Sequence, residues 1–179
     1  MKENRARVLF KLDKAQKLRI LKLLIKPIMF IPLVHNYRPT GLLSFPKQWE
    51  SDFIKICAEY KNSIIFKVGN SATLEGSYCS FKKLITIIAD RTGYISTENL
   101  IIIFSHELAH CLQYKFYNTK NKKDMLFYFD DNLEFEREAD TLSYHIYKAY
   151  FKHKISIHAN TFRSYYSKES VEFLRKTFN

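Results

Sequence analysis

The stretch TENLIIIFSHELAHCLQYKFY, residues 97–117, decides how the fold of this 179-residue chain is interpreted. Ser96 or Thr97 can cap a helix, and the uncharged run from Leu100 to Phe104 continues directly into the polar part of the segment. These features predict one helix that ends near Tyr117. Its strongly apolar start suits a helix buried in the core of a domain.

His106 and His110 are four residues apart on that predicted helix. Positions i and i+4 share a helix face, so both imidazoles can present a ring nitrogen to one ion at the distance of about 2.0–2.1 Å that zinc requires. Glu107 lies at the edge of the same face, where it can reach a water on the metal without occupying the metal. His-Glu-x-x-His is the metalloprotease arrangement, with the Glu as general base.

A catalytic zinc needs a third protein ligand. No further His follows until His145, so a carboxylate is the remaining choice. Residues 118–131 predict a polar loop that contains three candidates: Asp124, Asp130 and Asp131. The other candidate is Glu136, on a second long helix predicted from about Leu133 to Phe151.

Glu136 and Asp140 are four residues apart and share one face of that second helix. Glu136 can complete a site of two His and one Glu. Asp140 can accept the free N–H of a ligand histidine, which fixes the tautomer of the ring. The small Ala139 would permit close approach of the two helices. Glu138 points about 200° away from Glu136 and is predicted to face solvent.

Three short strands are predicted before the HELAH helix. They comprise Ser63–Val68, Leu74–Phe81 and Leu84–Ala89, and they follow a helix over Lys47–Tyr60. The unbroken apolar, β-branched third strand predicts burial on both faces. The expected fold class is therefore α+β, with a small three-stranded sheet packed on the HELAH helix and on the following Glu-bearing helix.

The net charge of +11 is concentrated near the N-terminus, because residues 1–40 alone carry +8. We expect a basic N-terminal arm over residues 1–40 and one domain over residues 41–179. Residues 4–25 predict an amphipathic helix that could lie on an anionic membrane, contact nucleic acid phosphates, or pack on the domain with a solvated lysine face. No transmembrane span is predicted, because charges interrupt every apolar run of the arm.

Composition and cysteine usage narrow the class of protein. With four Gly and four Pro, the chain is neither collagen-like nor a Gly/Pro-rich disordered chain, and 46% hydrophobic residues can fill a core. Cys57, Cys79 and Cys111 form an odd, sparse set without the spacing of a disulfide framework. We expect a reduced, cytoplasmic protein.

HELAH at residues 106–110 followed by EREAD at residues 136–140 resembles the gluzincin metallopeptidases. The EREAD form is similar to the minimal ImmA/IrrE-like and Ste24/HtpX-like peptidases, over about residues 47–151. The resemblance implies that His106, His110 and Glu136 bind Zn²⁺, that Glu107 is the base, and that Asp140 supports a ligand histidine. It also implies a zincin-like core that hydrolyses peptide bonds of a peptide or protein substrate lying along the outer strand.

The chain departs from both groups. Ste24/HtpX-like peptidases span the membrane several times, and ImmA/IrrE-like peptidases often carry a separate DNA-binding or sensor domain. The alternative function is a non-catalytic metal-containing binding or structural protein whose basic arm docks on membrane or nucleic acid. The intact Glu107 argues against it, because a purely structural metal site needs no base.

Overall fold

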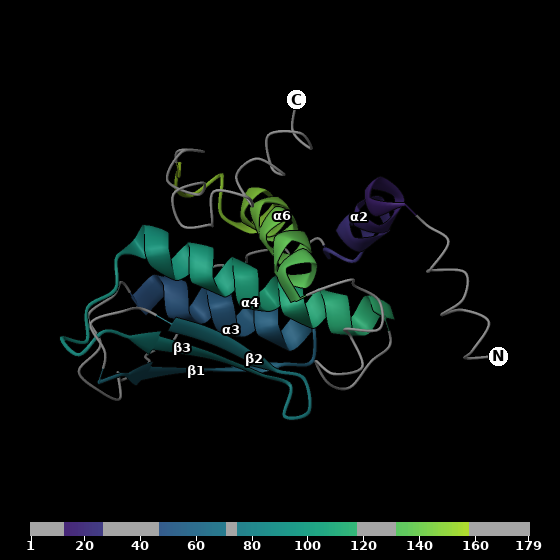
Figure 1. Ribbon diagram of the computed structural model, residues 1–179. Helices are drawn as coiled ribbons and strands as arrows, with labels where there is room; N and C mark the ends of the chain where they lie inside the picture. Colours follow the sequence, from purple (N-terminus) through teal and green to yellow (C-terminus); the bar gives the residue numbers. More distant parts are fainter. Residues whose placement is uncertain (1–12, 27–46, 71–74, 118–131, 158–179) are drawn as a thin grey trace.

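The computed structural model describes residues 13–26, 47–70, 75–117 and 132–157 (Figure 1). Within these ranges the chain forms, in order, seven elements: α2 (Lys14–Leu23), α3 (Lys47–Glu59), β1 (Ser63–Val68), β2 (Glu75–Cys79), β3 (Leu84–Ala89), α4 (Thr97–Tyr117) and α6 (Asn132–Tyr150). The predicted α+β class is confirmed, and the three strands fall where the apolar patterns placed them.

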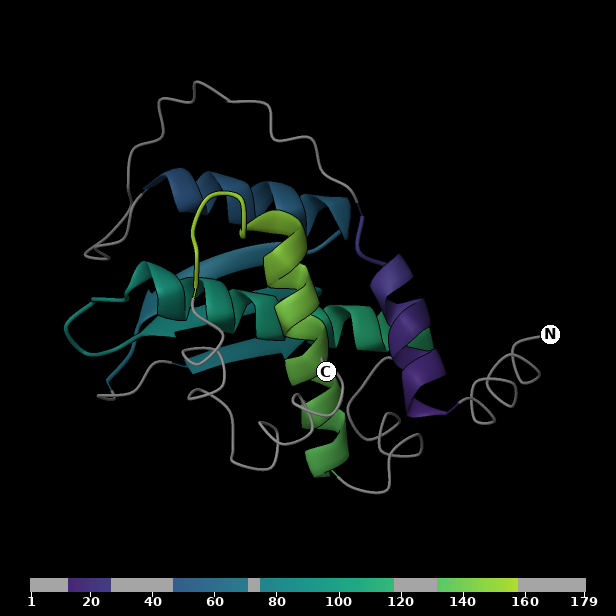
Figure 2. The same ribbon diagram turned by 90° about the horizontal axis from the view of Figure 1, so that it is seen from above.

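The sheet has the strand order β1-β3-β2. β1 pairs in parallel with β3, so that Phe66 lies opposite Ile87, and β2 pairs antiparallel with β3, so that Tyr78 lies opposite Ile85. β1 and β2 are therefore the edge strands. α3 and α4 lie along one face of the sheet, and α6 crosses α4 on the side away from the sheet (Figures 1 and 2).

Aromatic packing joins α3, α4 and the turn that follows α6. The ring centroid of Phe53 lies 4.4 Å from that of Phe104 and 5.5 Å from that of Phe151, and all three side chains are fully buried. Aromatic pairs at these separations add to the free energy gained from the buried area itself. This cluster fixes α4 as the central helix, with the sheet below it and α6 above it.

The prediction that β3 is buried on both faces is wrong. Ile85, Ile87 and Ala89 are buried, whereas Leu84, Thr86 and Ile88 alternate with them and are only partly covered. The reason is the one-sided arrangement of the helices: α3 and α4 cover one face, and no described helix covers the other (Figure 1). In this protein the unbroken apolar run belongs to the central strand of the sheet, but only one face of that strand is covered.

The described part of the N-terminal arm packs on the domain. Asp13 and Gln16 form a capping box that starts α2, and Leu18 and Leu21 are buried against α6 and α4. Among the interpretations of the arm, this placement agrees with a helix that packs on the domain; Lys14 and Arg19 are exposed, and Lys17 and Lys22 are half-buried. Residues 1–12 and 27–46, which hold the rest of the arm, lie outside the described ranges.

Two tyrosine hydroxyls hold the chain immediately after α2. The Tyr150 hydroxyl donates to the Lys26 carbonyl at 2.8 Å, and the Lys26 N–H donates to the Tyr60 hydroxyl at 2.8 Å. The two hydroxyls lie 2.5 Å apart. Two tyrosine side chains, at the ends of α3 and α6, thus bind the main chain that follows α2, in addition to the burial of the α2 leucines.

None of the helices in the described ranges combines the length and apolar character needed to cross a bilayer.

Candidate metal centre

α4 carries the candidate site deep inside the domain. The Ser96 hydroxyl accepts a hydrogen bond from the Asn99 N–H at 3.2 Å. Of the two residues predicted to cap this helix, Ser96 and Thr97, it is therefore Ser96 that does so. From Leu100 to Tyr117 nearly every side chain is buried, because the sheet packs on one side of α4 and α6 on the other. A helix enclosed in this way holds its polar side chains in fixed positions.

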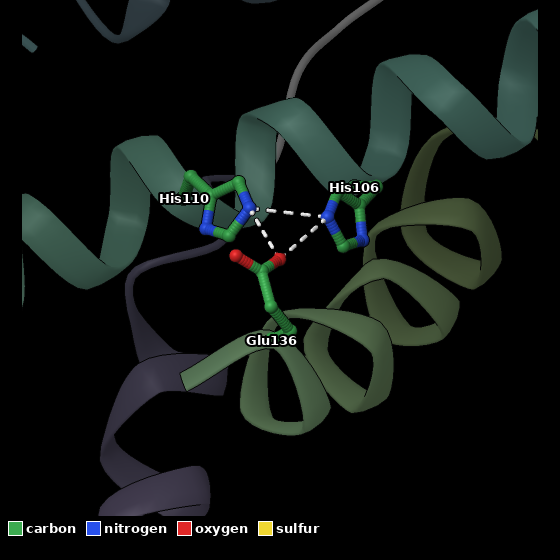
Figure 3. Close-up of side chains that lie close together, drawn as sticks. All are labelled: His106, His110 and Glu136. Atoms are coloured by element: carbon green, nitrogen blue, oxygen red, sulfur yellow. Dashed lines mark hydrogen bonds and ion pairs between the residues drawn. The ribbon is translucent and has the colours of Figure 1, made fainter. Parts of the chain in front are cut away.

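His106 and His110 project from α4 toward Glu136 of α6 (Figure 3). The Nε2 atoms of the two histidines are 3.0 Å apart, and the Glu136 Oε2 lies 3.3 Å from His106 Nε2 and 3.1 Å from His110 Nε2. Ligand atoms around a tetrahedral zinc with bonds of about 2.05 Å are separated by about 3.3 Å. The three atoms thus have the mutual spacing of three ligands of one zinc ion.

The charges around the cluster favour a cation. The Asp140 Oδ1 lies 2.9 Å from His106 Nδ1, on the far side of that ring from Glu136. Burial by itself lowers the pKa of His106, but hydrogen bonds with Asp140 and Glu136 and the nearby charge of Glu107 outweigh it and raise the pKa well above its usual value. The pKa of Glu136 is held well below its usual range, because its hydrogen bonds to both histidines overcome its burial.

Gln113 is a partner of the site that the sequence analysis missed. Its Oε1 lies 2.8 Å from His110 Nδ1, and its Nε2 donates to the Phe135 carbonyl of α6 at 2.9 Å. The ring of Phe135 stacks on that of His110 with centroids 4.8 Å apart. Gln113 therefore does for His110 what Asp140 does for His106: it accepts the Nδ1–H, which leaves Nε2 as the ligand atom.

The prediction that Glu138 faces solvent is wrong. Its Oε2 accepts a hydrogen bond from the Tyr117 hydroxyl at 2.9 Å, and its Oε1 accepts one from Gln113 Nε2 at 3.1 Å. The side chain lies between the C-terminal half of α4 and α2, which cover this side of α6. Burial raises the pKa of Glu138 to about 7, although the hydrogen bonds from Gln113 and Tyr117 oppose the rise.

This pKa predicts the effect of Glu138→Gln on stability. The folded protein holds the proton more tightly than an unfolded chain with a pKa near 4.5 does, so the free energy of unfolding falls as pH rises from about 4.5 to about 7. Glutamine keeps the acceptor without the charge. We expect the variant to be more stable than wild type by on the order of 2 kcal/mol at pH 8, and equal to it near pH 4.5.

Urea denaturation at the two pH values, in EDTA to exclude linkage to metal binding, measures the difference. A variant no more stable than wild type at pH 8 would show that the Glu138 carboxylate is ionised without cost in the fold.

The carboxylate of Glu107 lies against the edge strand β2. A Cβ atom added to Gly76 would come within 2.6 Å of both Glu107 Oε1 and Ile103 Cγ2, so only glycine lets β2 approach α4 this closely. Glu107 itself is buried. The predicted base therefore lies against the backbone of β2, and its charge acts on His106.

Asp124, Asp130 and Asp131 lie outside the described residues. Within the described ranges, the group of side chains able to hold a metal is formed by His106, His110 and Glu136.

Comparison of the chain with protein-family models, with curated proteins and with solved structures found no match.

Proposed function

We propose that the protein is a zinc-dependent metallopeptidase, with His106, His110 and Glu136 as the metal ligands and Glu107 as the general base. The observation that carries this proposal is the meeting of two imidazole nitrogens and one carboxylate oxygen at separations of 3.0–3.3 Å, beside a buried glutamate. The resemblance of HELAH and EREAD to the gluzincins supports the same assignment.

The donor set favours a catalytic zinc site over a structural one. Structural zinc sites use four protein ligands, most of them cysteines, whereas two His and one Glu leave a fourth position for water or substrate. Cys57 and Cys111 are buried in the core, and Cys79 is exposed on the edge strand. No cysteine belongs to the described metal-ligating group.

A zinc ion held here would polarise a substrate carbonyl and lower the pKa of a coordinated water to about 7. Glu107 accepts the proton of the attacking water and delivers it to the leaving amine. Asp140 and Gln113 keep the Nδ1 atoms of the two histidines protonated, so each ring presents Nε2 in a fixed orientation. Because these groups lie on two packed helices, they need little rearrangement as the reaction proceeds.

The edge strand β2 supplies a binding surface for an extended peptide. Its inner neighbour is β3, and within the described ranges no strand pairs with its other edge. A substrate that adds to this edge gains main-chain hydrogen bonds and runs past Gly76, directly beside Glu107. Of the two edge strands, β2 is the one that lies against the base.

The metal content of the purified protein tests the proposal. We expect about one zinc per chain by mass spectrometry in the wild type, and loss of that zinc in His106→Ala, because the variant lacks one of three ligands. Arg91→Ala, an exposed change in the turn after β3, is the matched control and should keep its zinc. A wild-type protein that takes up no zinc even when zinc is supplied would end the proposal.

A further inference from the structure

The turn between β2 and β3 carries the most exposed large apolar side chain of the described residues. Phe81 is 86% exposed, and the two residues that follow it, Lys82 and Lys83, are exposed as well. The turn projects from one end of the sheet (Figure 1). A partner that covered Phe81 would gain the free energy that burying this ring releases.

Phe81 is presented on an anchored turn. The Ser63 N–H, at the start of β1, donates to the Lys83 carbonyl at 2.8 Å. Lys83 itself has a φ of 50°, the left-handed conformation that closes the turn before β3 begins. The hydrogen bond ties the turn to the neighbouring strand, so the position of Phe81 is set by the sheet.

Lysines from other segments gather at the same end of the molecule. Lys61 lies two residues before Ser63, the first residue of β1, and the Nζ atoms of Lys26 and Lys115 lie 5.8 and 6.0 Å from the ring of Tyr60. Together with the turn they form what we call the basic end: Phe81, Lys26, Lys61, Lys82, Lys83 and Lys115. Glu59 pairs with Lys26 and offsets one of these charges.

The apolar surface continues from the turn onto the open face of the sheet. Leu84 and Ile88 alternate with the buried residues of β3, and Ile65 lies between Ile64 and Phe66, which pack against the core. These three side chains therefore point away from the helices and remain partly exposed. The basic end thus joins a projecting aromatic tip, flanking ammonium groups and an adjoining aliphatic surface.

We propose that the basic end docks on an anionic phospholipid membrane, with Phe81 inserted at the interface and the lysines against the lipid headgroups. Interfacial binding uses this combination of an apolar projection and cationic side chains whose stems can bury while their charges stay in water. Single-stranded nucleic acid instead requires a row of aromatic rings on which successive bases stack. The basic end presents one exposed aromatic ring, that of Phe81, and not a row of rings, so lipid is the better fit.

Docking in this orientation holds the candidate metal centre near the lipid surface. β2 connects the turn to Gly76, and the three residue steps between Cys79 and Gly76 span about 10 Å. Gly76 lies against Glu107. The membrane contact itself does not depend on the proposed peptidase activity, and binding to vesicles tests it separately.

The experiment measures binding of the full-length protein to vesicles of phosphatidylglycerol and phosphatidylcholine, and to vesicles of phosphatidylcholine alone, by co-sedimentation. We expect wild type to bind the anionic vesicles, with an affinity that falls as salt is added. Phe81→Ser should weaken binding about tenfold, and Lys82→Glu at least fivefold. The matched controls are Tyr94→Ser and Lys152→Glu. Tyr94 is 58% exposed and lies outside this turn, and Lys152 is also exposed. The vesicle affinity of both controls should stay within about twofold of that of wild type.

A second measurement follows insertion directly. Phe81→Trp should show a blue-shifted emission on addition of anionic vesicles, and Tyr94→Trp should not, with the buried Trp49 as a constant background in both. The proposal is overturned if wild type does not bind the anionic vesicles, or if Phe81→Ser binds them as wild type does. Binding of single-stranded DNA that requires Phe81, without vesicle binding, would assign this surface to nucleic acid instead.

Discussion

We expect Glu107→Gln to keep its zinc and to lose hydrolysis, with a fall in kcat of about 10²–10⁴-fold, as the proposed role of general base requires. The side chain is buried between α4 and β2, so glutamine fits the same space without a clash. It cannot accept a proton from water, however, and the general-base step is lost. Glu107 is not among the three clustered ligand atoms, so the metal should remain at about one ion per chain.

Cleavage of a pool of unstructured fluorescent peptides by the zinc-loaded proteins measures this loss. Arg91→Ala, exposed in the turn after β3, serves as the control and should cleave like wild type. Equal cleavage by Glu107→Gln and wild type would show that another group takes the proton. The inactive variant should also retain bound peptides long enough for their identification.

If Glu136 is the third ligand, as we propose, we expect Glu136→Ala to abolish tight zinc binding. The Glu136 carboxylate is the only ligand in the described cluster contributed by α6, and it lies 3.1–3.3 Å from both imidazole nitrogens. Removal of a partner that only supports a ligand costs about 10–100-fold in metal affinity, so loss of a ligand itself should exceed this range. Competition with a chelator of known zinc affinity measures the change.

Glu138→Gln is the matched control for that experiment, because it alters a glutamate two residues away on the same helix. The variant should keep its zinc, since Gln113 retains an acceptor at position 138. Asp140→Ala should fall between the two, with a loss of about 10–100-fold, because it removes only the support for His106. Unchanged affinity in Glu136→Ala would move the third ligand to another residue, with Asp124, Asp130 and Asp131 as the next candidates.

Apolar, β-branched runs and a helix cap predicted these elements of the fold well, because such signals act over a few neighbouring residues. Ser63–Val68 and Leu84–Ala89 are observed as strands at their predicted bounds, and the HELAH helix begins at its predicted cap. These local signals cannot show which other elements cover an apolar face. Coverage depends on where α3 and α4 lie after folding, and for this reason the burial of β3 was predicted wrongly.

The candidate site shows the same division between local and tertiary information. The pairing of His106 with His110, and of Glu136 with Asp140, follows from i, i+4 spacing on two separate helices. Gln113 and Glu138 gain their roles only because α6 crosses α4, which brings residues 25 apart in the sequence into a hydrogen bond. The prediction for Glu138 used only its angle from Glu136 around the axis of one helix. That angle gives no information about how two helices cross, so the prediction was wrong.

The hydrogen bond between Tyr150 and Lys26 also sets an order of events during synthesis. The two residues are 124 positions apart, and at about 5–20 residues per second the ribosome takes about 6–25 s to make the second after the first. Throughout that interval α2 lacks the surface of α6 that buries Leu18 and Leu21. α2, the first described helix to be made, therefore cannot complete its docking until α6 has been made. A nascent chain stalled before Tyr150 should expose the leucines of α2 to chaperones.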